Sequence, residues 1–461
     1  MVFKIHLSIL EPDYIEKRNQ QYLFIWKELP YWMVVDEEAY RVIRLADGSR
    51  SLKEIAKLVY SNDQFDREKI TELNSFVNAL KDLNLLKMPN KKKENKVKSN
   101  SKPILENITI NITNKCNLRC KHCYISEFNK ENNFPVSSFK NFVNTAKNYK
   151  YTSRNLNFAI LGGEPLLEKE KLIEIAKFGK NIGSEVIVST NGQLINSEFA
   201  RRAKQHKLIV QVSIEGSNKL VNDFIRGNGT FQKAEKGIKE LVRYGVYTII
   251  SMVVHEFNFQ DIEKFYFFGR SLKVDEVRFI PLKIMGRGKL NFNPILKKDL
   301  LLDIHNLIKK YPESKRYFKR DYYTIMKTSC ANSNQTLYCG TGSKTLLIDA
   351  NGEVYPCPNH CLPEFKCGNI TKKSFEDIWL KSPILKKVRS TYNINKINNE
   401  CSNCIVKYWC AGGCRGEAYE NFRIMTSKAI GCEDIRNSII ETFWILSKED
   451  YTQYSKPREY F

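Results

Sequence analysis

From residue 105 to about residue 311, short apolar runs alternate with longer stretches in which apolar residues recur at helical spacing. The runs are rich in β-branched residues and are typical of buried strands, whereas the stretches between them are typical of amphipathic helices. Six strands are expected, at 108–112, 156–161, 186–189, 208–213, 247–254 and 276–280. Six strand–helix units predict an α/β fold, a closed or partial TIM-type (β/α)6 barrel with its chemistry on the loops after the strands.

A different pattern occupies residues 1–87. Strand-like stretches at 2–10, 21–26 and 32–35 precede three amphipathic helical stretches. Ser51 and Glu54 have the spacing of a capping box, which predicts the start of the second helix. One apolar face is expected on the third helix, formed by Ile70, Leu73, Val77, Leu80 and Leu83. Three helices with a small antiparallel sheet predict a winged helix-turn-helix domain.

Residues 88–104 are rich in Lys, Asn and Ser and have almost no apolar content, which predicts a basic linker. The chain would then consist of a domain at 1–87, the linker, a barrel at 105–311 and a C-terminal domain at 312–461.

The charge of the chain narrows the choice of partner. The 461 residues carry a net charge of +23, which suggests an acidic partner such as a nucleic acid, a membrane surface or an acidic peptide. Residues 1–87 contain 13 Lys and Arg against 14 Asp and Glu, whereas a DNA reader needs a basic face. We therefore expect no DNA binding by this domain. No apolar run approaches the roughly 18 residues of a membrane span, and the first residues include acids, so we expect a cytoplasmic protein without a membrane partner.

Thirteen cysteines in a chain without an export signal favour metal chemistry over disulfides. Cys116, Cys120 and Cys123 follow the first barrel strand as CxxxCxxC, three thiolates that can surround one 4Fe-4S cubane and leave one iron open. A zinc site is the alternative. Zinc takes four ligands, usually from CxxC pairs, and would need His122 as the fourth.

The run CNLRCKHCY around this triad resembles the radical S-adenosylmethionine (radical SAM) superfamily. The resemblance implies that S-adenosylmethionine binds the open iron and is cleaved to a 5′-deoxyadenosyl radical. It also implies a cofactor site beyond the cysteines. Its members would be Gly162, Gly163, Glu164 and Pro165 at the methionine, Ser189 at the ribose or carboxylate, Arg226 at the carboxylate and Tyr124 at the adenine.

The C-terminal cysteines have a spacing similar to the seven-cysteine signature of SPASM domains, which carry two further 4Fe-4S clusters. The outer cluster would be held by Cys401, Cys404, Cys410 and Cys432, and the inner one by Cys339, Cys357 and Cys414. Cys330 is a candidate fourth inner ligand. If it binds, the inner cluster is a closed relay; if not, an open iron can take a substrate thiolate. Two zinc knuckles are the alternative, and Cys361 and Cys367 stay unassigned.

Residues 1–87 resemble the peptide-recognition domain of enzymes that modify ribosomally made peptides. Asp36 to Glu38, the Asp47-Gly48 turn and Leu85-Leu86 carry this resemblance. It implies that a leader peptide binds as an added strand beside a helix. Sulfatase-maturing relatives have an Asp, proposed as a base, directly after the inner cysteine, where this chain has Pro358.

These expectations combine into a radical SAM oxidoreductase that matures a ribosomally synthesised peptide, as sactipeptide synthases do. We predict thioether links from cysteine sulfur to an α-carbon, made with S-adenosylmethionine and three 4Fe-4S clusters, about twelve irons per chain. The partners would be a precursor peptide and an electron donor such as flavodoxin or ferredoxin; no catalytic side chain is predicted. Carbon–carbon crosslinks, thioethers at other carbons and formylglycine formation need the same domains and cofactors and are alternative products. A DNA-binding iron–sulfur regulator is the alternative from another class.

Overall fold

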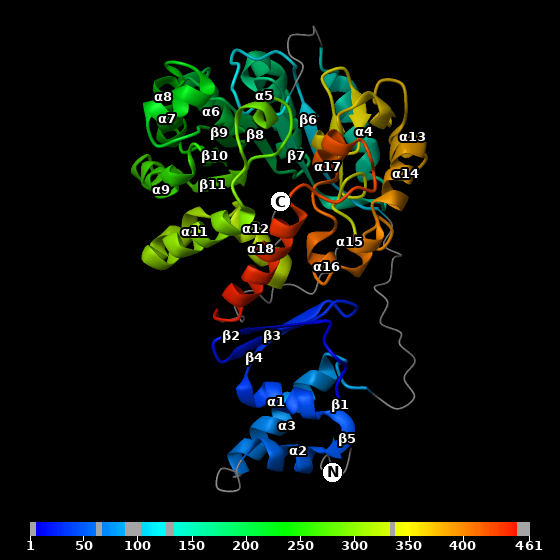
Figure 1. Ribbon diagram of the computed structural model, residues 1–461. Helices are drawn as coiled ribbons and strands as arrows, with labels where there is room; N and C mark the ends of the chain where they lie inside the picture. Colours follow the sequence, from blue (N-terminus) through cyan, green and yellow to red (C-terminus); the bar gives the residue numbers. More distant parts are fainter. Residues whose placement is uncertain (1–5, 61–66, 88–102, 126–132, 332–336, 450–461) are drawn as a thin grey trace.

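The computed structural model describes residues 6–60, 67–87, 103–125, 133–331 and 337–449 (Figure 1). Most of the predicted linker, residues 88–102, therefore lies outside the described residues. An N-terminal unit of sheet and helices lies at one end of the molecule, and the remaining elements form a larger body around one sheet (Figure 1). Within the described residues, no helix is long and apolar enough to cross a membrane.

The N-terminal unit contains more strands than its hydrophobic pattern predicts. Strands β2 (Tyr14–Arg18), β3 (Gln21–Trp26) and β4 (Tyr31–Asp36) form an antiparallel sheet in that order, and β1 (His6–Ser8) pairs with β5 (Asp47–Ser51). Strands β2 and β5 are largely polar, so only their pairing with a neighbouring strand identifies them. The expected turn at Asp47-Gly48 is therefore the start of a strand.

Three helices complete this unit: α1 (Glu37–Leu45), α2 (Leu52–Val59) and α3 (Arg67–Asp82). The capping box is confirmed, because Ser51 Oγ accepts from the Glu54 amide and the Glu54 carboxylate accepts from the Ser51 amide. Leu73, Val77 and Leu80 of α3 are buried in the core of the unit. Helices and antiparallel sheet are thus present, while their winged helix-turn-helix arrangement stays a prediction.

The six predicted barrel strands are all present and parallel. They are β6 (Leu105–Asn111), β7 (Thr152–Leu161), β8 (Val186–Thr190), β9 (Ile209–Ser213), β10 (Thr248–Val254) and β11 (Glu276–Pro281). Each pairs with the next in chain order, so their carboxyl ends lie along one edge of the sheet. This arrangement confirms an α/β fold with a mostly parallel, TIM-like sheet.

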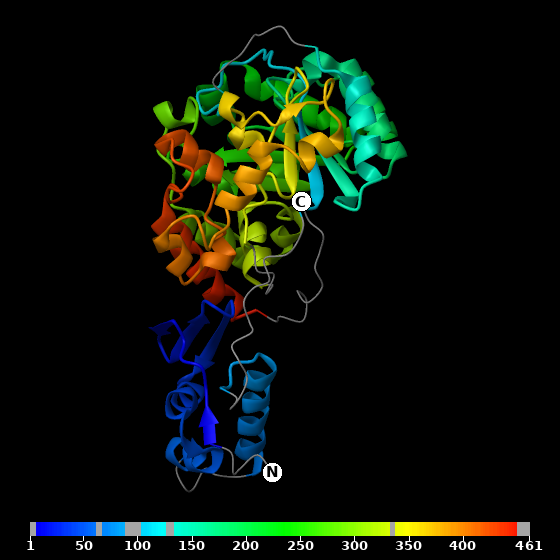
Figure 2. The same ribbon diagram turned by 90° about the vertical axis from the view of Figure 1, so that its right-hand side faces the viewer.

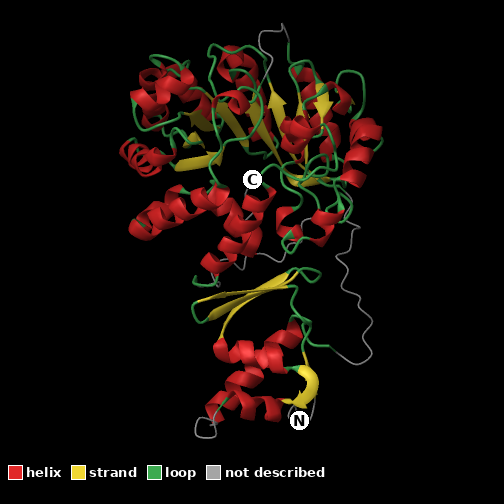
Figure 3. Ribbon diagram, viewed as in Figure 1, coloured by secondary structure: helices red, strands yellow, loops and turns green. Residues whose placement is uncertain are grey.

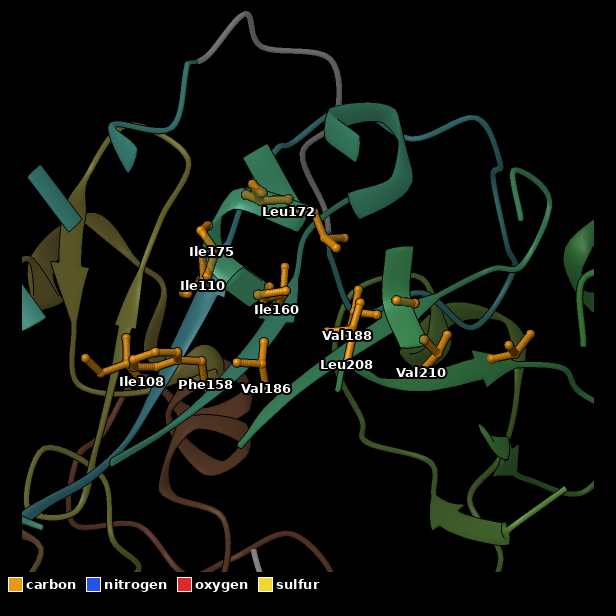
Figure 4. Close-up of a cluster of buried hydrophobic side chains, with 14 of the residues drawn as sticks. Ile108, Ile110, Phe158, Ile160, Leu172, Ile175, Val186, Val188, Leu208 and Val210 are labelled. Carbon is orange, nitrogen blue, oxygen red and sulfur yellow. The ribbon is translucent and has the colours of Figure 1, made fainter. Parts of the chain in front are cut away.

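Helices cover the outer face of this sheet (Figure 3). They are α4 (Val136–Lys147), α5 (Lys169–Asn181), α6 (Ser197–Gln205), α8 (Thr230–Arg243), α9 (Ile262–Ser271) and α11 (Lys297–Lys310). The shorter α7 (Lys219–Arg226) follows β9 and buries Ile225 against Leu282 and Phe292. Figure 4 shows Ile110 and Ile160 of the strands beside Leu172 and Ile175 of α5, while Ile108 lies beside Phe158. This apolar layer fixes where each strand ends and therefore where the loops that follow it lie.

The sheet continues beyond the predicted end of the barrel. Strand β12 (Thr345–Ile348) pairs in parallel with β6, and β13 (Glu353–Tyr355) and β14 (Gly368–Asn369) extend the sheet to nine strands. The other C-terminal elements are mostly helical: α12 (Tyr322–Ala331), α13 (Phe375–Trp379), α14 (Pro383–Thr391), α15 (Asn399–Asn403), α16 (Lys407–Cys410), α17 (Arg415–Phe422) and α18 (Cys432–Leu446). The C-terminal region is therefore joined to the barrel by backbone pairing.

The N-terminal sheet packs against α18 and α12 (Figure 2). Trp32 stacks on Phe443 with ring centroids 4.6 Å apart and donates its indole N–H to the Cys330 carbonyl at 3.0 Å. Arg18 donates to the Glu441 carboxylate at 3.0 Å. An apolar interface with polar bonds at its margin thus connects the first and last parts of the chain.

Candidate active site and cysteine groups

The loop that carries Cys116, Cys120 and Cys123 follows β6 at the carboxyl edge of the sheet. Backbone hydrogen bonds fix it to helix α7 and to the loop after β11. The Lys121 amide donates to the Ile225 carbonyl, and the Arg287 amide donates to the Cys123 carbonyl, both at 2.9 Å. Arg287 also donates from Nε to the Cys120 carbonyl at 2.9 Å. The conformation of this loop therefore depends on residues more than one hundred positions away in the sequence.

The two glycines after β7 are needed for the close approach of this cysteine loop. A Cβ at Gly163 would lie 2.2 Å from the Lys115 carbonyl oxygen, and one at Gly162 would lie 2.5 Å from that of Thr113. Gly162 also has a φ of +150°. The amides of Gly163 and Glu164 donate to these same carbonyls at 2.7 and 2.8 Å. The glycine pair thus packs backbone against backbone beside the cysteines.

Glu164 is buried and its carboxylate is occupied within the chain. It accepts from the Thr190 hydroxyl at 2.6 Å, the Asn191 amide at 2.8 Å and the Leu166 amide at 3.0 Å. Burial raises the pKa of this carboxyl, and the donors partly offset that effect. Pro165 follows at the start of a short 3-10 helix, Pro165–Glu168. The structure places all four motif residues beside the cysteine loop, while contact of Glu164 with a methionine ammonium stays a prediction.

A buried ion pair lies below the cysteine loop. Arg226, the last residue of α7, donates two hydrogen bonds to Glu215, one of them at 2.5 Å, and its Nη1 lies 3.9 Å from Cys120 Sγ. The other Glu215 oxygen accepts from the Val253 amide at 2.7 Å. Arg226 is therefore held in place by a carboxylate while one of its nitrogens faces a cysteine sulfur.

His122 also contacts this carboxylate, with Nε2 3.3 Å from Glu215 Oε1. Burial lowers the pKa of His122 to about 4, so the imidazole is neutral at pH 7. Burial by itself raises the pKa of Glu215, yet His122, Arg226 and the Val253 amide together hold that pKa below the usual value. At neutral pH the cation opposite Glu215 is consequently Arg226.

Ser189 points toward a polar chain across the sheet. Its Oγ accepts from Gln211 Nε2 at 3.1 Å, and Gln211 Oε1 accepts from Arg278 at 2.6 Å. These three residues come from β8, β9 and β11. Ser189 is thus connected to the neighbouring strand β9 and through it to β11, and its role toward a cofactor stays a prediction.

The three thiols of the cysteine loop interact with one another. Burial raises the pKa of Cys116, and the nearby Glu164 and the other two thiols add to that effect. Burial and Cys120 likewise raise the pKa of Cys123. All three are free thiols. Three neighbouring thiols with a cationic Arg226 beside them fit a cluster held by thiolates, because the guanidinium offsets the added negative charge.

The thiols of the C-terminal cysteines interact within two sets, and their roles as cluster ligands stay predictions. In the outer group, burial raises the pKa of Cys410 to about 12, and the thiols of Cys404, Cys432 and Cys401 raise it further. In the inner group, burial raises the pKa of Cys357 to about 12, with added effects from Cys414 and Cys339. The Thr341 hydroxyl lies between two inner sulfurs, 3.2 Å from Cys339 and 3.4 Å from Cys357.

Cys330 does not lie with the inner group. It sits on α12 in the apolar interface with the N-terminal sheet, beside Leu23 and Ile25. Burial raises the pKa of the Cys330 thiol, and a hydrogen bond with the Thr442 side chain partly offsets that effect. The structure thus assembles three inner cysteines and gives no support to the prediction that Cys330 completes them. Cys367 is buried and donates to the Phe365 carbonyl, whereas Cys361 is exposed.

Within the described ranges, no three His, Cys, Asp or Glu side chains come together as ligands of a metal ion would. A cubane cluster binds each thiolate through a different iron, so its ligands are spread more widely than those of one ion. The cysteine groups therefore fit 4Fe-4S clusters through the interactions among their own thiols and through the hydrogen-bond donors beside them.

The loop after β11 contains functional candidates that the sequence reasoning missed. A Cβ at Gly286 would lie 2.6 Å from the Cys123 carbonyl oxygen, so this end of the loop packs on the first cysteine group. At the other end, Lys283 Nζ lies 3.9 Å from Cys414 Sγ, and the Ile284 amide donates to Glu417 at 2.7 Å. The loop thus contacts both cysteine groups. The signal in the sequence was Arg287, which lies between Gly286 and Gly288 in the segment after a predicted barrel strand.

Comparisons with known proteins agree with this geometry. The radical SAM superfamily matches residues 110–269, and an iron–sulfur cluster-binding domain, SPASM, matches residues 339–405. The chain carries a radical SAM domain and a SPASM domain. The matched radical SAM segment contains all three cysteines of the first loop, and the matched SPASM segment begins at Cys339.

Three known proteins resemble this chain over most of its length. A cysteine-type anaerobic sulfatase-maturating enzyme of Clostridium novyi is 27% identical and covers 70% of this chain and 91% of its own. The subtilosin biosynthesis protein AlbA of Bacillus subtilis is 26% identical and covers 88% of each chain. The crystal structure of Streptococcus suis SuiB bound to precursor peptide SuiA aligns with a TM-score of 0.58 at 16% identity, over 90% of this chain and 97% of that one.

Proposed function

We propose that this chain is a maturase that forms crosslinks in a ribosomally synthesised precursor peptide, with links from cysteine sulfur to an α-carbon as the product. The likeness to AlbA, a bacteriocin biosynthesis protein, carries the proposal because it extends over 88% of both chains. A match of that length must include at least part of the N-terminal unit, whereas the sulfatase-maturating relative matches 70% of this chain.

In this proposal, Cys116, Cys120 and Cys123 hold a 4Fe-4S cluster that, when bound with S-adenosylmethionine, supplies the 5′-deoxyadenosyl radical. Arg226 pairs with the cofactor carboxylate, since Glu215 orients its guanidinium and one nitrogen still faces the cysteine loop. Gly162 to Pro165 and Ser189 line the rest of the cofactor site. The role of the buried pair is to fix a positive charge at this position before the cofactor arrives.

The N-terminal unit would bind the leader of the precursor. Strand β4 is an edge of its sheet, so its outer backbone groups are available for an added strand. Beside β4 lies a cavity of about 440 Å³, lined by residues 30–34, Leu83, Cys330, Ala331, Trp409 and Ser447. These mostly apolar walls suit the side chains of an extended peptide segment.

The inner cysteine group supports thioether formation in particular. With Cys339, Cys357 and Cys414 as its ligands, an inner 4Fe-4S cluster would keep one iron open to a substrate thiolate. Forming a sulfur–carbon link removes two hydrogens from the peptide, so the reaction is an oxidation. The outer group, with four cysteines, would hold the third cluster as an electron relay.

Formylglycine formation is the second candidate, because a sulfatase-maturating enzyme is 27% identical to this chain. Pro358 follows Cys357 and is the first residue of a short 3-10 helix. Proline has no group that accepts a proton, so an aspartate base of the kind proposed for those relatives is missing at this position. The peptide-crosslinking activity is therefore favoured.

Coexpression of the chain with a small Cys-rich peptide encoded beside it tests the proposal. We expect the peptide to lose the mass of two hydrogen atoms per link, and alkylation to show that one cysteine thiol is consumed for each link. The Cys116→Ala variant is the matched control and should leave the peptide unchanged. A peptide of unchanged mass with wild-type enzyme, under conditions in which the enzyme cleaves S-adenosylmethionine, would refute this pairing. Conversion of a cysteine to formylglycine would support the second candidate.

A further inference from the structure

An exposed apolar surface lies directly outside the first cysteine loop. Leu220 and Phe224 are one turn apart on α7 and point outward; Leu220 is 81% exposed and Phe224 is 47% exposed. Phe257, which follows β10, stacks on Phe224 with centroids 4.3 Å apart. Leu290 of the short helix α10 (Gly288–Asn291) is also exposed. Together with Lys121, we call these residues the Lys121 patch.

Lys121 connects this patch to the cluster-binding residues. It lies between Cys120 and Cys123 in the sequence, and its ammonium lies 3.4 Å from the centroid of the Phe224 ring. Its backbone is fixed on both sides, because its amide donates to Ile225 of α7 and its carbonyl accepts from Asn291 of α10. The patch is thus a firmly held surface, with Lys121 next to Cys120 and two positions before Cys123, both predicted cluster ligands.

The patch has a basic margin. Arg119 of the cysteine loop, Lys219 at the start of α7 and Lys289 of α10 are exposed and belong to the same segments. The exposed acid beside Phe257 is Glu256, whose carboxylate accepts two hydrogen bonds from Asn293. A centre of aromatic and aliphatic side chains with a cationic margin is the composition expected of a surface for an acidic protein partner.

We propose that the Lys121 patch is the docking surface for an acidic, low-potential one-electron carrier protein of the flavodoxin type. The inference rests on the proposed radical chemistry, in which S-adenosylmethionine is cleaved by one electron that the chain must receive from outside. The carrier's flavin hydroquinone loses one electron and becomes the semiquinone. The cluster held by Cys116, Cys120 and Cys123 would supply this electron to S-adenosylmethionine, whose C5′–S bond would break to give methionine and the radical. Electron transfer weakens steeply with distance, so the surface closest to the cluster ligands is the effective one.

The test compares two reductants on the reconstituted full-length holoenzyme. Photoreduced flavodoxin must dock, whereas dithionite is a small ion that does not need the patch. The readout is the initial rate of 5′-deoxyadenosine release, without any peptide. We expect Phe224→Ser/Phe257→Ser to lower the flavodoxin-driven rate at least about fivefold while the dithionite-driven rate stays within about twofold of wild type. Leu58→Ser/Phe267→Ser, two exposed apolar residues elsewhere, is the matched control and should change neither rate.

A charge-reversal pair gives an independent measurement. Lys219→Glu/Lys289→Glu should slow the flavodoxin-driven rate and weaken its dependence on ionic strength, whereas Lys177→Glu/Lys236→Glu should not. Equal losses with both reductants, or no loss with flavodoxin in either pair, would overturn the proposal. So would a wild-type dimer that Phe224→Ser/Phe257→Ser converts to a monomer, because the patch would then join two copies. A failure of peptide crosslinking alone leaves these rates unaffected and concerns the proposed product only.

Discussion

Glu215 shows how single residues determine the chemistry of this site. It is fully buried, and its two carboxylate oxygens bind Arg226 on one side and the Val253 amide on the other. A buried carboxylate without such partners would be protonated or destabilising, so the pair is stable only as a unit. Through Arg226, this unit reaches Cys120. The positive charge beside the first cysteine group therefore depends on a glutamate from the end of the fourth barrel strand.

Glu215→Gln removes the negative charge opposite Arg226 and leaves a buried guanidinium without a counter-ion. We expect the free energy of unfolding to fall by about 3 kcal/mol, together with weaker binding of S-adenosylmethionine. Chemical denaturation and equilibrium binding measure the two effects. Glu198→Gln is the control, because Glu198 is exposed and its ion pair with Arg202 at 3.5 Å contributes little. Equal losses in both variants would contradict the assigned role of Glu215.

The buried Asp321 makes the stability of the fold depend on pH. It accepts from the Thr324 amide at the start of α12, and burial raises its pKa to about 6. The folded chain therefore holds this proton more tightly than the unfolded chain does. The stability that protonated Asp321 contributes is present below about pH 4. It is lost as the pH rises to about 6, because the buried carboxyl then ionises.

Asp321→Asn keeps the acceptor and removes the charge. We expect it to raise the free energy of unfolding by roughly 2 kcal/mol at pH 7, and by much less at pH 4. Urea denaturation at the two pH values measures this difference, with the exposed Asp299→Asn as control. A gain that is the same at both pH values would show that the carboxyl does not titrate as described.

At the scale of elements, the loop from Leu282 to Asn291 connects the two cysteine groups. Lys283 reaches Cys414 of the inner group, and Arg287 binds carbonyls of the first loop. Glu417 and Asn421 of α17 hold Ile284 from the other side. This short segment is fixed at both ends, so it sets the distance between the two cysteine groups more firmly than contacts within either domain could.

Lys283→Met removes a positive charge next to the inner group and keeps most of the side-chain volume. A nearby cation favours the reduced cluster, so we expect the reduction potential of the inner cluster to fall by on the order of tens of millivolts. Redox titration followed by electron paramagnetic resonance measures it. Lys289→Met, in the same loop but exposed, should leave the potential unchanged; an equal shift in both variants would point to an unspecific charge effect.

At the scale of the whole molecule, the N-terminal sheet packs against α18 near the end of the chain. Trp32, Phe443 and Trp409 form an aromatic cluster, with Trp409 edge-on to Phe443 at 5.0 Å. Trp409 lies between Cys404 and Cys410 in the sequence, so the interface borders the outer cysteine group. The proposed leader site and an auxiliary cluster site are thereby parts of one packed region.

Trp32→Ala should loosen this interface, since it removes the ring stack and the bond to the Cys330 carbonyl. We expect peptide conversion to fall several-fold, while 5′-deoxyadenosine release without peptide stays within about twofold of wild type. Trp32→Phe keeps the stack and should retain most of the conversion. Limited proteolysis between residues 88 and 102 should become faster in the Ala variant only. An equal loss of both activities would mean that the interface supports folding and not the coupling of the two parts.

The sequence alone determined the six parallel strands and the capping box at Ser51, and its cysteine spacings carry the prediction of the cluster ligands. These features depend on local spacing: apolar periodicity, turn chemistry and short cysteine motifs are all readable within a few residues. It could not identify the polar strands β2 and β5, which exist because a neighbour pairs with them. The tertiary structure alone placed Cys330 away from the inner group, extended the barrel sheet with β12 and brought Glu215, Lys283 and Arg287 to the cysteines. Those outcomes depend on contacts between residues far apart in the chain, where packing and buried charge, and not local pattern, decide which side chains meet.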